Sequence, residues 1–237
     1  MNKVLGRYVI LGFLLMMAMV FLSIGMSDSA EATPSIPISI SSDADLDSFI
    51  ASHGFYGDGT EGNPYLINNL EIDATGHTNA ITLSNIHKHL MIADCTLTNA
   101  GQAGIAMNDV SNVTIQGNTI NNNGERAVML EHSNNVTMNA NDCTNNPTDG
   151  FRIVYSSDIS VFGNYITNSY DGIYLGVVQN STFEINQFPL VDARGFFVVE
   201  SDNNTFSDNS ILDSTHGLYI DGPCCKIPTD TLPTPNN

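Results

Sequence analysis

Two aspartates, Asp149 and Asp171, stand 22 residues apart, and each directly precedes a glycine followed by an apolar residue. Carboxylates held close together raise each other's pKa, and they can share a proton or bind a Ca²⁺ ion. Arginines occur in the same pattern, with Arg152 three residues after Asp149 and Arg194 directly before another such glycine. If these segments lie side by side, the four side chains form a cluster suited to a polysaccharide lyase or a glycoside hydrolase.

Aromatic side chains occupy a second position of this pattern. Tyr174, Phe197 and Tyr219 each lie two residues after a glycine, as Arg152 does. On successive strands of a sheet their rings would be about 4.8 Å apart. Aromatic faces stack on the apolar faces of sugar rings, and arginine binds hydroxyls or carboxylates. The pattern therefore predicts a carbohydrate-binding strip formed by these four residues. The alternative is that the rings only stabilise the sheet by packing on one another.

Both positions belong to an internal repeat of 22 to 24 residues. A Gly or Ala followed by alternating apolar residues recurs at steps of 24, 23, 23, 22, 23 and 22, starting at Ala80, Gly104, Ala127, Gly150, Gly172, Gly195 and Gly217. Most units contain two further short apolar alternations, bounded by Asn, Gly, Ser or Asp. This predicts three short strands per repeat and leaves no room for a helix within a unit.

Such units cannot bury their apolar faces alone, but stacking them builds one continuous core. The sequence therefore predicts an all-β fold, a parallel β-helix of roughly seven coils, right-handed as parallel crossovers nearly always are. Strand alternation then sorts the first strand of each coil into outward columns. One column contains Thr82, Ala106, Met129, Arg152, Tyr174, Phe197 and Tyr219, and the column just before the glycines contains Ala103, Arg126, Asp149, Asp171, Arg194 and His216.

A further column supports this winding and decides the pairing of two cysteines. One repeat position is occupied at steps of 23, 23, 23, 22 and 23 by Cys95, Asn118, Asn141, Asn164, Asn186 and Asn209. Stacked amides would hydrogen-bond from coil to coil. Cys143 lies two coils beyond Cys95, about 10 Å along the axis, whereas a disulfide needs Cα atoms within about 7 Å. Both thiols should therefore be free. For Cys224-Cys225, beyond the last coil, a vicinal bond and an intermolecular link both remain open.

The ends of the solenoid differ. Ser42 begins a predicted short helix as its N-cap, Leu46 and Ile50 lie on one face, and Gly54 ends it. This helix would cover the first coil, whose exposed strand edges otherwise invite aggregation. No comparable cover is evident after the last coil. Three alternatives remain open: the last coil is incomplete, a partner covers it, or the chain is a fragment of a longer one. The predicted segments are 33–64 for linker and capping helix, 65–222 for the β-helix, and 223–237 for a flexible tail rich in Pro and Thr.

The turn-rich link into Asn63-Pro64-Tyr65, the preceding helix and the Asn-rich coils resemble the pectate-lyase-like superfamily of right-handed parallel β-helix proteins. Within it, the chain is most similar to NosD-type and carbohydrate-binding, sugar-hydrolase repeats of exported, archaeal-like surface proteins. The resemblance covers about residues 41–222. It implies that the first-strand sheet is the binding face. The Asn-Thr-Asp, Asp-Asp, Gly-His-Gly and Arg-Ile-Lys motifs of polygalacturonases are absent, which puts catalysis in doubt.

The NosD-type resemblance also implies copper, which prefers convergent His, Cys or Met ligands. His87 and His89 are the candidates, since residues at i and i+2 can share one side of a strand or loop. Two histidines without a third ligand make a weak site, and the alternative is that they are surface polar residues.

Composition and the N-terminus bear on partners and location. The net charge is −18, which repels phosphate backbones and excludes nucleic acid as a partner. Lys3 and Arg7 precede an uncharged run, and Ala30-Glu31-Ala32 offers a cleavage site, so residues 1–32 are predicted to be a signal peptide or an uncleaved membrane anchor. The folded part is therefore expected to be secreted or on the cell surface. Four glycosylation sequons begin at Asn112, Asn135, Asn180 and Asn203.

Together these features predict an exported or cell-surface β-helix module, non-catalytic, that binds carbohydrate or serves as an adhesive or structural element. One alternative is a polysaccharide lyase or glycoside hydrolase on the first-strand sheet, using Asp149, Arg152, Asp171 and Arg194. The other is a NosD-like accessory copper protein. No cofactor is expected, apart from Ca²⁺ at the aspartate pair.

Overall fold

The computed structural model describes residues 33–222. The predicted signal or anchor segment at residues 1–32, the tail at residues 223–237 and the Cys224-Cys225 pair lie outside the described residues. Between residues 33 and 222, no helix is long and apolar enough to cross a membrane.

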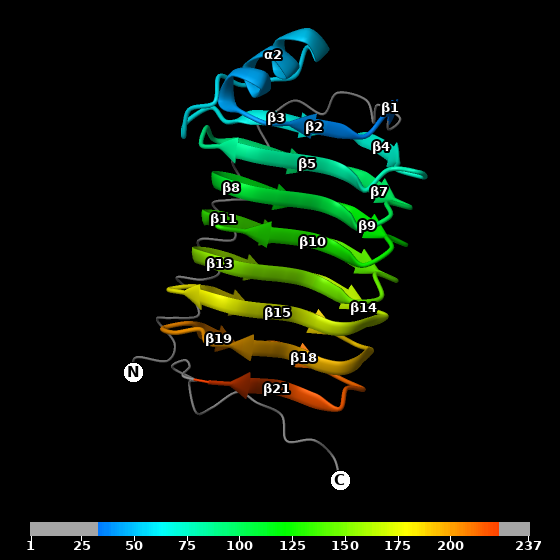
Figure 1. The fold of residues 1–237 in the computed structure, drawn as a ribbon, viewed down its shortest axis with the longest axis vertical. Helices are drawn as coiled ribbons and strands as arrows, with labels where there is room; N and C mark the ends of the chain where they lie inside the picture. The colour runs from blue at the N-terminus through cyan, green and yellow to red at the C-terminus, as the bar shows by residue number, and fades with distance from the viewer. Residues whose placement is uncertain (1–32, 223–237) are drawn as a thin grey trace, which may run out of the picture. The chain divides into compact units, whose positions relative to one another are not determined.

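Every coil contributes strands to three faces, and each strand of these faces pairs in parallel with its equivalent in the next coil (Figure 1). The first face contains β2 (Ile38–Ile40), β5 (Asn79–Ile86), β8 (Ala103–Gln116), β10 (Arg126–Glu131), β13 (Asp149–Phe162), β15 (Ser169–Gln179), β18 (Val191–Val199) and β21 (His216–Asp221). This confirms the predicted all-β parallel solenoid of about seven turns.

The second face begins with β3 (Tyr65–Asn68) and β6 (Leu90–Ala93). It continues through the second halves of β8 and β13, which run around a corner from the first face, together with β11 (Asn134–Asn139), β16 (Thr182–Glu184) and β19 (Thr205–Ser207). The third face contains β1 (Thr33–Ser35), β4 (Leu70–Asp73), β7 (Thr96–Thr98), β9 (Thr119–Asn121), β12 (Asp142–Thr144), β14 (Tyr165–Thr167), β17 (Gln187–Phe188) and β20 (Ser210–Ile211).

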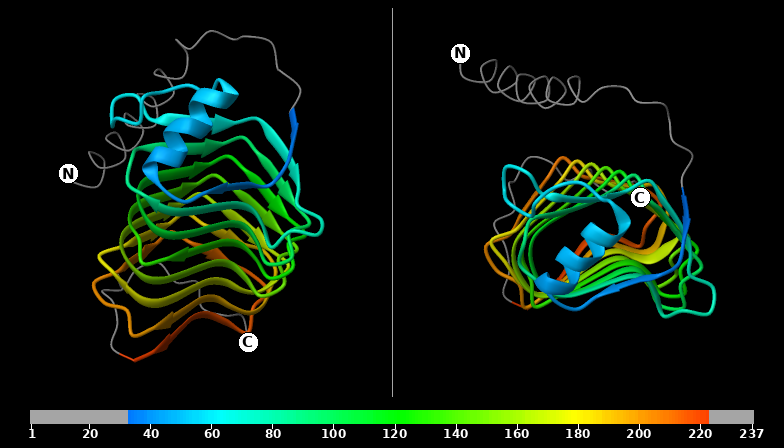
Figure 2. Two further views of the ribbon diagram at one scale, coloured as in Figure 1. Left: turned by 45° about the horizontal axis from the view of Figure 1, so that its top comes forward. Right: turned by 90° about the horizontal axis from the view of Figure 1, so that it is seen from above.

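Helix α2 (Asp43–His53) covers the first coil, as predicted. Ser42 caps its N-terminus by accepting a hydrogen bond from the backbone of Asp45, and Gly54 ends it with φ of 69°. Leu46 and Ile50 are buried in the core. Seen from above, the coils form a ring and the helix lies across it (Figure 2). An ion pair on the rim, between Lys88 Nζ and Asp47 at 2.6 Å, further attaches the helix to the coil.

Two strands precede the helix and were not anticipated. β1 pairs with β4 on the third face, and β2 pairs with β5 on the first face. The interval predicted as linker and capping helix therefore also starts two of the faces. Alternation in Ile38-Ser39-Ile40 was the available signal, and both isoleucines are buried.

The glycine or alanine that opens each first strand points inward, where space is limited. At Gly172, a Cβ would meet the ring of Phe188 and come within 2.5 Å of the carbonyl oxygen of Gly195 in the next coil. Gly150 has a similar environment, facing Ile166 and the carbonyl of Gly172. The absent side chain therefore lets first-face strands approach the third-face side chains closely.

The predicted asparagine column is a buried hydrogen-bond ladder. Asn141 Nδ2 donates to Asn164 Oδ1 at 2.9 Å, and Asn164 Nδ2 donates in the same way to Asn186 Oδ1. The same amides also bond the backbone, since Asn164 Nδ2 reaches the carbonyl of Met138 and its Oδ1 accepts from the backbone N–H of Asn141. The ladder starts at Cys95, whose N–H donates to Asn118 Oδ1 at 2.9 Å. Buried turn backbone is thereby satisfied in every coil it crosses.

Cys95 and Cys143 are both free and buried, which confirms the prediction from axial spacing. Burial raises the pKa of the Cys95 thiol to about 11, and it raises the pKa of the Cys143 thiol well above its ordinary value. Neither thiol is therefore activated as a nucleophile.

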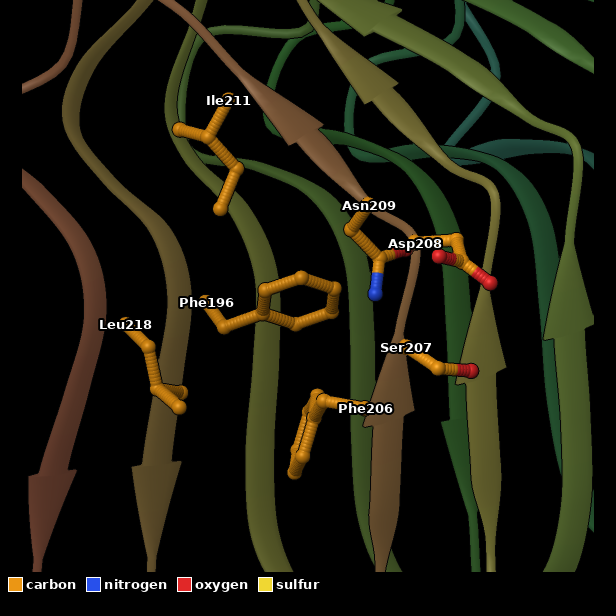
Figure 3. Close-up of a pocket in the computed structure, with 7 residues that line it drawn as sticks. All are labelled: Phe196, Phe206, Ser207, Asp208, Asn209, Ile211 and Leu218. Atoms are coloured by element: carbon orange, nitrogen blue, oxygen red, sulfur yellow. The ribbon is translucent and has the colours of Figure 1, made fainter. Parts of the chain in front are cut away.

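The last described coil leaves part of the core open. Phe196, Phe206, Ile211 and Leu218 surround a hollow of about 10 Å³, room for about one water molecule (Figure 3). Phe196 and Phe206 remain buried, while Ile211 and Leu218 are only half-buried. A covering partner at this end stays a prediction.

Candidate functional site

The outward column of the first face is arranged as the repeat predicts. Arg152 is paired with Tyr174, Tyr174 with Phe197, and Phe197 with Tyr219 on successive strands β13, β15, β18 and β21. These four residues, here called the strip, lie on the face of a sheet whose opposite side is the buried core. The rigid sheet thus fixes their spacing along the axis.

The rings of the strip meet edge to face. The centroids of Tyr174 and Phe197 are 5.2 Å apart with an interplanar angle of 83°, and those of Phe197 and Tyr219 are 5.5 Å apart at 65°. Aromatic pairs favour this arrangement because the positive ring edge faces the negative ring face. The alternative given from sequence, that the rings pack on one another, therefore describes part of their role.

Arginine side chains cover two of the ring faces. The Arg152 guanidinium carbon lies 4.2 Å from the ring centroid of Tyr174, and that of Arg194 lies 3.7 Å from the centroid of Phe197. Each such contact contributes about 0.5–2 kcal/mol, depending on solvent exposure. Aromatic surface at the edge of the strip remains accessible on Tyr219, which is 42% exposed, and on Tyr170, which is 52% exposed. Tyr170 was not predicted from the sequence, because it lies on β15 but does not occupy the repeat position that defines the strip.

The missing side chain of Gly176 leaves space on the sheet surface for the ring of Tyr174. Gly176 lies two residues further along β15, and a Cβ there would be 3.1 Å from Cε1 and 3.3 Å from the hydroxyl oxygen of Tyr174. The Tyr174 ring therefore lies along its own strand, over Gly176 and beside Val154 of the neighbouring coil. A glycine between two apolar residues in a strand was the sequence signal for this close approach.

The charged column beside the strip is also in register, but its two aspartates have different partners. Asp171 is held by Arg194 through two hydrogen bonds, of 2.7 and 2.8 Å. Asp149 Oδ2 lies between Arg126 Nε at 3.6 Å and Arg152 at 3.9 Å. Arg126 itself pairs with Glu125 at 2.8 Å. The column therefore contains two adjacent aspartates flanked by Arg126 and Arg194, and Asp171 is already neutralised.

Asp149 is the unusual member of this charged column. It is 3% exposed, and neither its Oδ2 nor Arg126 Nε makes a hydrogen bond. Burial raises the pKa of Asp149 to about 6, against the opposing attraction of Arg126 and Arg152 and with a smaller contribution from Asp171. A carboxyl group in this range can both donate and accept a proton near neutral pH.

Metal ligands do not converge among the described residues. Between residues 33 and 222 there is no group of three or more His, Cys, Asp or Glu side chains placed to hold a metal ion. His87 Nδ1 contacts the hydroxyl of Ser111 at 3.2 Å, and its backbone N–H donates to Asp43 at 2.8 Å. His89 lies on the same turn. Copper at these histidines and Ca²⁺ at Asp149 and Asp171 stay predictions.

The four sequon asparagines form one corner column of the coils. Their φ angles are 50–61°, a left-handed conformation that asparagine tolerates well. Asn135 donates to Asn112 and Asn203 donates to Asn180, both at 2.7 Å. The residue after each asparagine is buried and the threonine is partly exposed. The Asn-x-Thr pattern therefore has a structural explanation in the shape of this corner. Glycosylation of Asn112, Asn135, Asn180 and Asn203 stays a prediction.

Comparison with known proteins agrees with this geometry. The protein-family model described as the right-handed β-helix region matches residues 53–211 of the sequence. The chain belongs to the right-handed β-helix family. No curated protein sequence matches it. The NosD-type branch and the archaeal source stay predictions.

Two solved structures share the fold of this β-helix protein. One is the A-module of the mannuronan C-5 epimerase AlgE4 from Azotobacter vinelandii, with 15% identity, a TM-score of 0.54, and coverage of 68% of this chain and 58% of that one. The other is the full-length tailspike protein 2 of Escherichia coli O157:H7 bacteriophage CAB120, with 12% identity, a TM-score of 0.52, and coverage of 61% and 25%. The chain thus spans little more than half of the first structure and a quarter of the second.

Proposed function

We propose that this protein is an exported, non-catalytic β-helix module that binds a neutral glycan on its first face. The strip carries the proposal. Between residues 33 and 222 the sequence has 22 acidic residues and only four basic ones. Three of these four, Arg126, Arg152 and Arg194, lie on the first face beside the aromatic rings. Such an accumulation of arginine and aromatic side chains is typical of surfaces that recognise other molecules.

The contacts indicate how a sugar would bind. The exposed parts of Tyr219 and Tyr170 offer apolar surface to a pyranose ring. Arg152 stacks on Tyr174 and has a single distant ion contact, so N–H groups remain free to donate to hydroxyls. Arg194 is bound at two points by Asp171 and cannot offer the same fork to a carboxylate. Together with the net charge of −18, this favours neutral over acidic glycans.

The comparisons support a carbohydrate-related role at a coarser level. The name of the Azotobacter vinelandii protein states an activity on mannuronan. At 15% identity the likeness extends to the fold only, and this fold supports many activities. Export is part of the proposal because of the N-terminal sequence, and a membrane anchor would be that same segment left uncleaved.

A glycan array with neutral and acidic glycans tests the proposal. We expect neutral glycans to bind. Tyr219→Ala removes an exposed ring, Tyr174→Ala removes the ring on which Arg152 stacks, and each should weaken binding about five- to tenfold. Tyr165→Ala is the matched control for Tyr219→Ala, because Tyr165 is 41% exposed and Tyr219 is 42% exposed, but Tyr165 lies on the third face. Unchanged binding in both strip variants would reject the strip as the site. Absence of binding by the unaltered protein would favour a purely structural role.

A second candidate function rests on one observation, the raised pKa of Asp149. Its carboxyl lies beside Arg126 and Arg152, so it could transfer a proton to or from a sugar held on the strip. The protein would then be a polysaccharide lyase or a glycoside hydrolase. Reducing-end release from polysaccharides by the unaltered protein, abolished in Asp149→Asn, would favour the enzyme. Binding without product release would favour the module.

A further inference from the structure

A second hollow lies at the corner where the first face turns into the second. It has a volume of about 360 Å³, within the range of small-ligand sites. Its lining includes His132, Asn134, Tyr155, Ser157, Val177 and Gln179, which come from three successive coils. It is separate from the hollow of Figure 3, and no residue of the strip lines it.

An interrupted ring stack explains the hollow. His132, Tyr155 and Val177 occupy one corner position at steps of 23 and 22 residues. The rings of His132 and Tyr155 are stacked nearly in parallel, with centroids 5.1 Å apart and an interplanar angle of 12°. The third member, Val177, is too small to continue the stack. One face of the Tyr155 ring is therefore covered by His132, while the side toward Val177 opens into the hollow.

The backbone turns these three side chains outward at a cost. All three have left-handed φ angles, 50° at His132, 51° at Tyr155 and 57° at Val177. Earlier coils have Asn85 and Asp109 at this position, residue types that accept such angles readily. For a bulky or β-branched residue, a left-handed conformation costs about 1–3 kcal/mol. Stability of the turn therefore does not account for the presence of Tyr155 and Val177.

The lining is polar, and apart from His132 it consists of Ser, Asn, Gln, Tyr and Val side chains. Asn134, Ser157 and Gln179 contribute amide and hydroxyl groups, and no Asp, Glu, Lys or Arg lines the hollow. Tyr155 is 59% exposed, so its ring is accessible. An aromatic face surrounded by neutral hydrogen-bonding groups complements a pyranose ring, with its apolar face and its hydroxyl edge. An acidic sugar would find no Lys or Arg in this lining.

We propose that this corner hollow is a subsite for a neutral pyranose, which stacks on the open face of Tyr155 where a third ring would stand. The inference rests on the proposed function, and it extends the binding surface from the strip around the corner. Tyr174 lies over Gly176, and Gly176 directly precedes Val177. A glycan bound at both places therefore runs parallel to strands β13 and β15, around the solenoid rather than along its axis.

Titration calorimetry with defined oligosaccharides tests the subsite. The probes are maltohexaose, cellohexaose and mannohexaose as neutral chains, and hexagalacturonate as an acidic one. Tyr155→Ala removes the platform, and Val177→Tyr fills the hollow while leaving Tyr155 in place. Each should weaken the neutral hexaose that binds best by about tenfold, whereas Tyr165→Ala should leave its affinity unchanged. The ring-proton NMR signals of His132 should shift on binding, because His132 stacks on Tyr155.

The possible results separate the two proposals. If Tyr174→Ala weakens binding while Tyr155→Ala and Val177→Tyr do not, the strip binds glycan and the corner subsite is wrong. If hexagalacturonate binds in preference to every neutral probe, the assignment to a neutral sugar is wrong. If the unaltered protein binds none of the probes, the proposed function and the subsite are both overturned. Circular dichroism of each variant shows whether a loss of binding reflects a loss of fold.

Discussion

Replacing Asp149 with asparagine tests the electrostatics of the first face most directly. Asn has nearly the shape of a protonated aspartate, so the variant resembles the neutral acid at every pH. In the folded protein burial raises the pKa of Asp149 from 3.8 to about 6, whereas in the unfolded chain the group ionises near its ordinary value. The folded state therefore binds the proton more strongly, and the stability that Asp149 contributes is lost as the pH rises from about 4 to about 6.

The pKa values give the size of the effect. A change from 3.8 to about 6 corresponds to about 3 kcal/mol in favour of the neutral form. Below about pH 4, Asp149→Asn and the unaltered protein should differ little in pH dependence. Above about pH 6, the variant should gain about 3 kcal/mol in the free energy of unfolding relative to that low-pH difference.

Urea unfolding followed by circular dichroism, at pH values from about 4 to about 8, measures this difference. Asp73→Asn is the control of opposite sign, because the hydroxyl of Thr75 lowers the pKa of Asp73 and its carboxylate stabilises the folded state. That variant should be less stable than the unaltered protein near neutral pH. If the difference in stability between Asp149→Asn and the unaltered protein does not shift in favour of the variant as the pH rises from about 4 to about 6, attraction to Arg126 and Arg152 outweighs burial, and the reasoning about Asp149 is refuted.

Three further predictions concern the solenoid itself. Gly172→Ala should lower the free energy of unfolding by about 2–3 kcal/mol, because its Cβ meets backbone and core atoms, whereas Gly62→Ala, with open space, should change it by less than about 0.5 kcal/mol; equal effects would contradict this packing. Asn164→Ala should cost about 3 kcal/mol in urea unfolding, since it leaves several buried backbone groups unpaired; a loss under about 1 kcal/mol would show that the amide ladder is dispensable. Maleimide labelling and peptide mapping should leave Cys95 and Cys143 unmodified until the protein is unfolded, and rapid labelling of the folded protein would show that they are accessible.

The periodic features of the sequence were sufficient to predict the fold. Inward apolar residues, the small residue at Gly172 and the amide at Asn164 each recur every 22 to 24 residues, because each contacts its own equivalent one coil away. A contact between equivalents leaves a period in the sequence. β1 and β2 pair with β4 and β5, but α2 and the link after it lie between them, so Thr33 is 37 residues from its partner Leu70 and Ile38 is 43 residues from its partner Ile81. These steps do not match the period, so the two strands were missed.

For the candidate site, the sequence predicted which residues lie on the outer surface, but not the contacts between their side chains. Alternation places Arg152 and Tyr174 on the outside of neighbouring strands, and the structure agrees. It does not determine that Arg152 lies on the ring of Tyr174, or that Arg194 binds Asp171, because these contacts depend on side-chain rotamers that no period records. The corner hollow was missed for a related reason, since it results from a valine in a position where a larger residue would have closed it.

Nearly identical coils have a consequence for how such a chain changes length. The coils that contain Asn118, Asn141, Asn164 and Asn186 present to the next coil the same three strand edges and the same asparagine side chain, so a duplicated segment of about 23 residues would find matching neighbours on both sides. Each duplication would lengthen the rod by about 4.8 Å. It would also add one outward residue to each column of the first face. In evolution, the reach of the molecule and the number of its surface contacts can therefore increase together, one coil at a time, without redesign of the core.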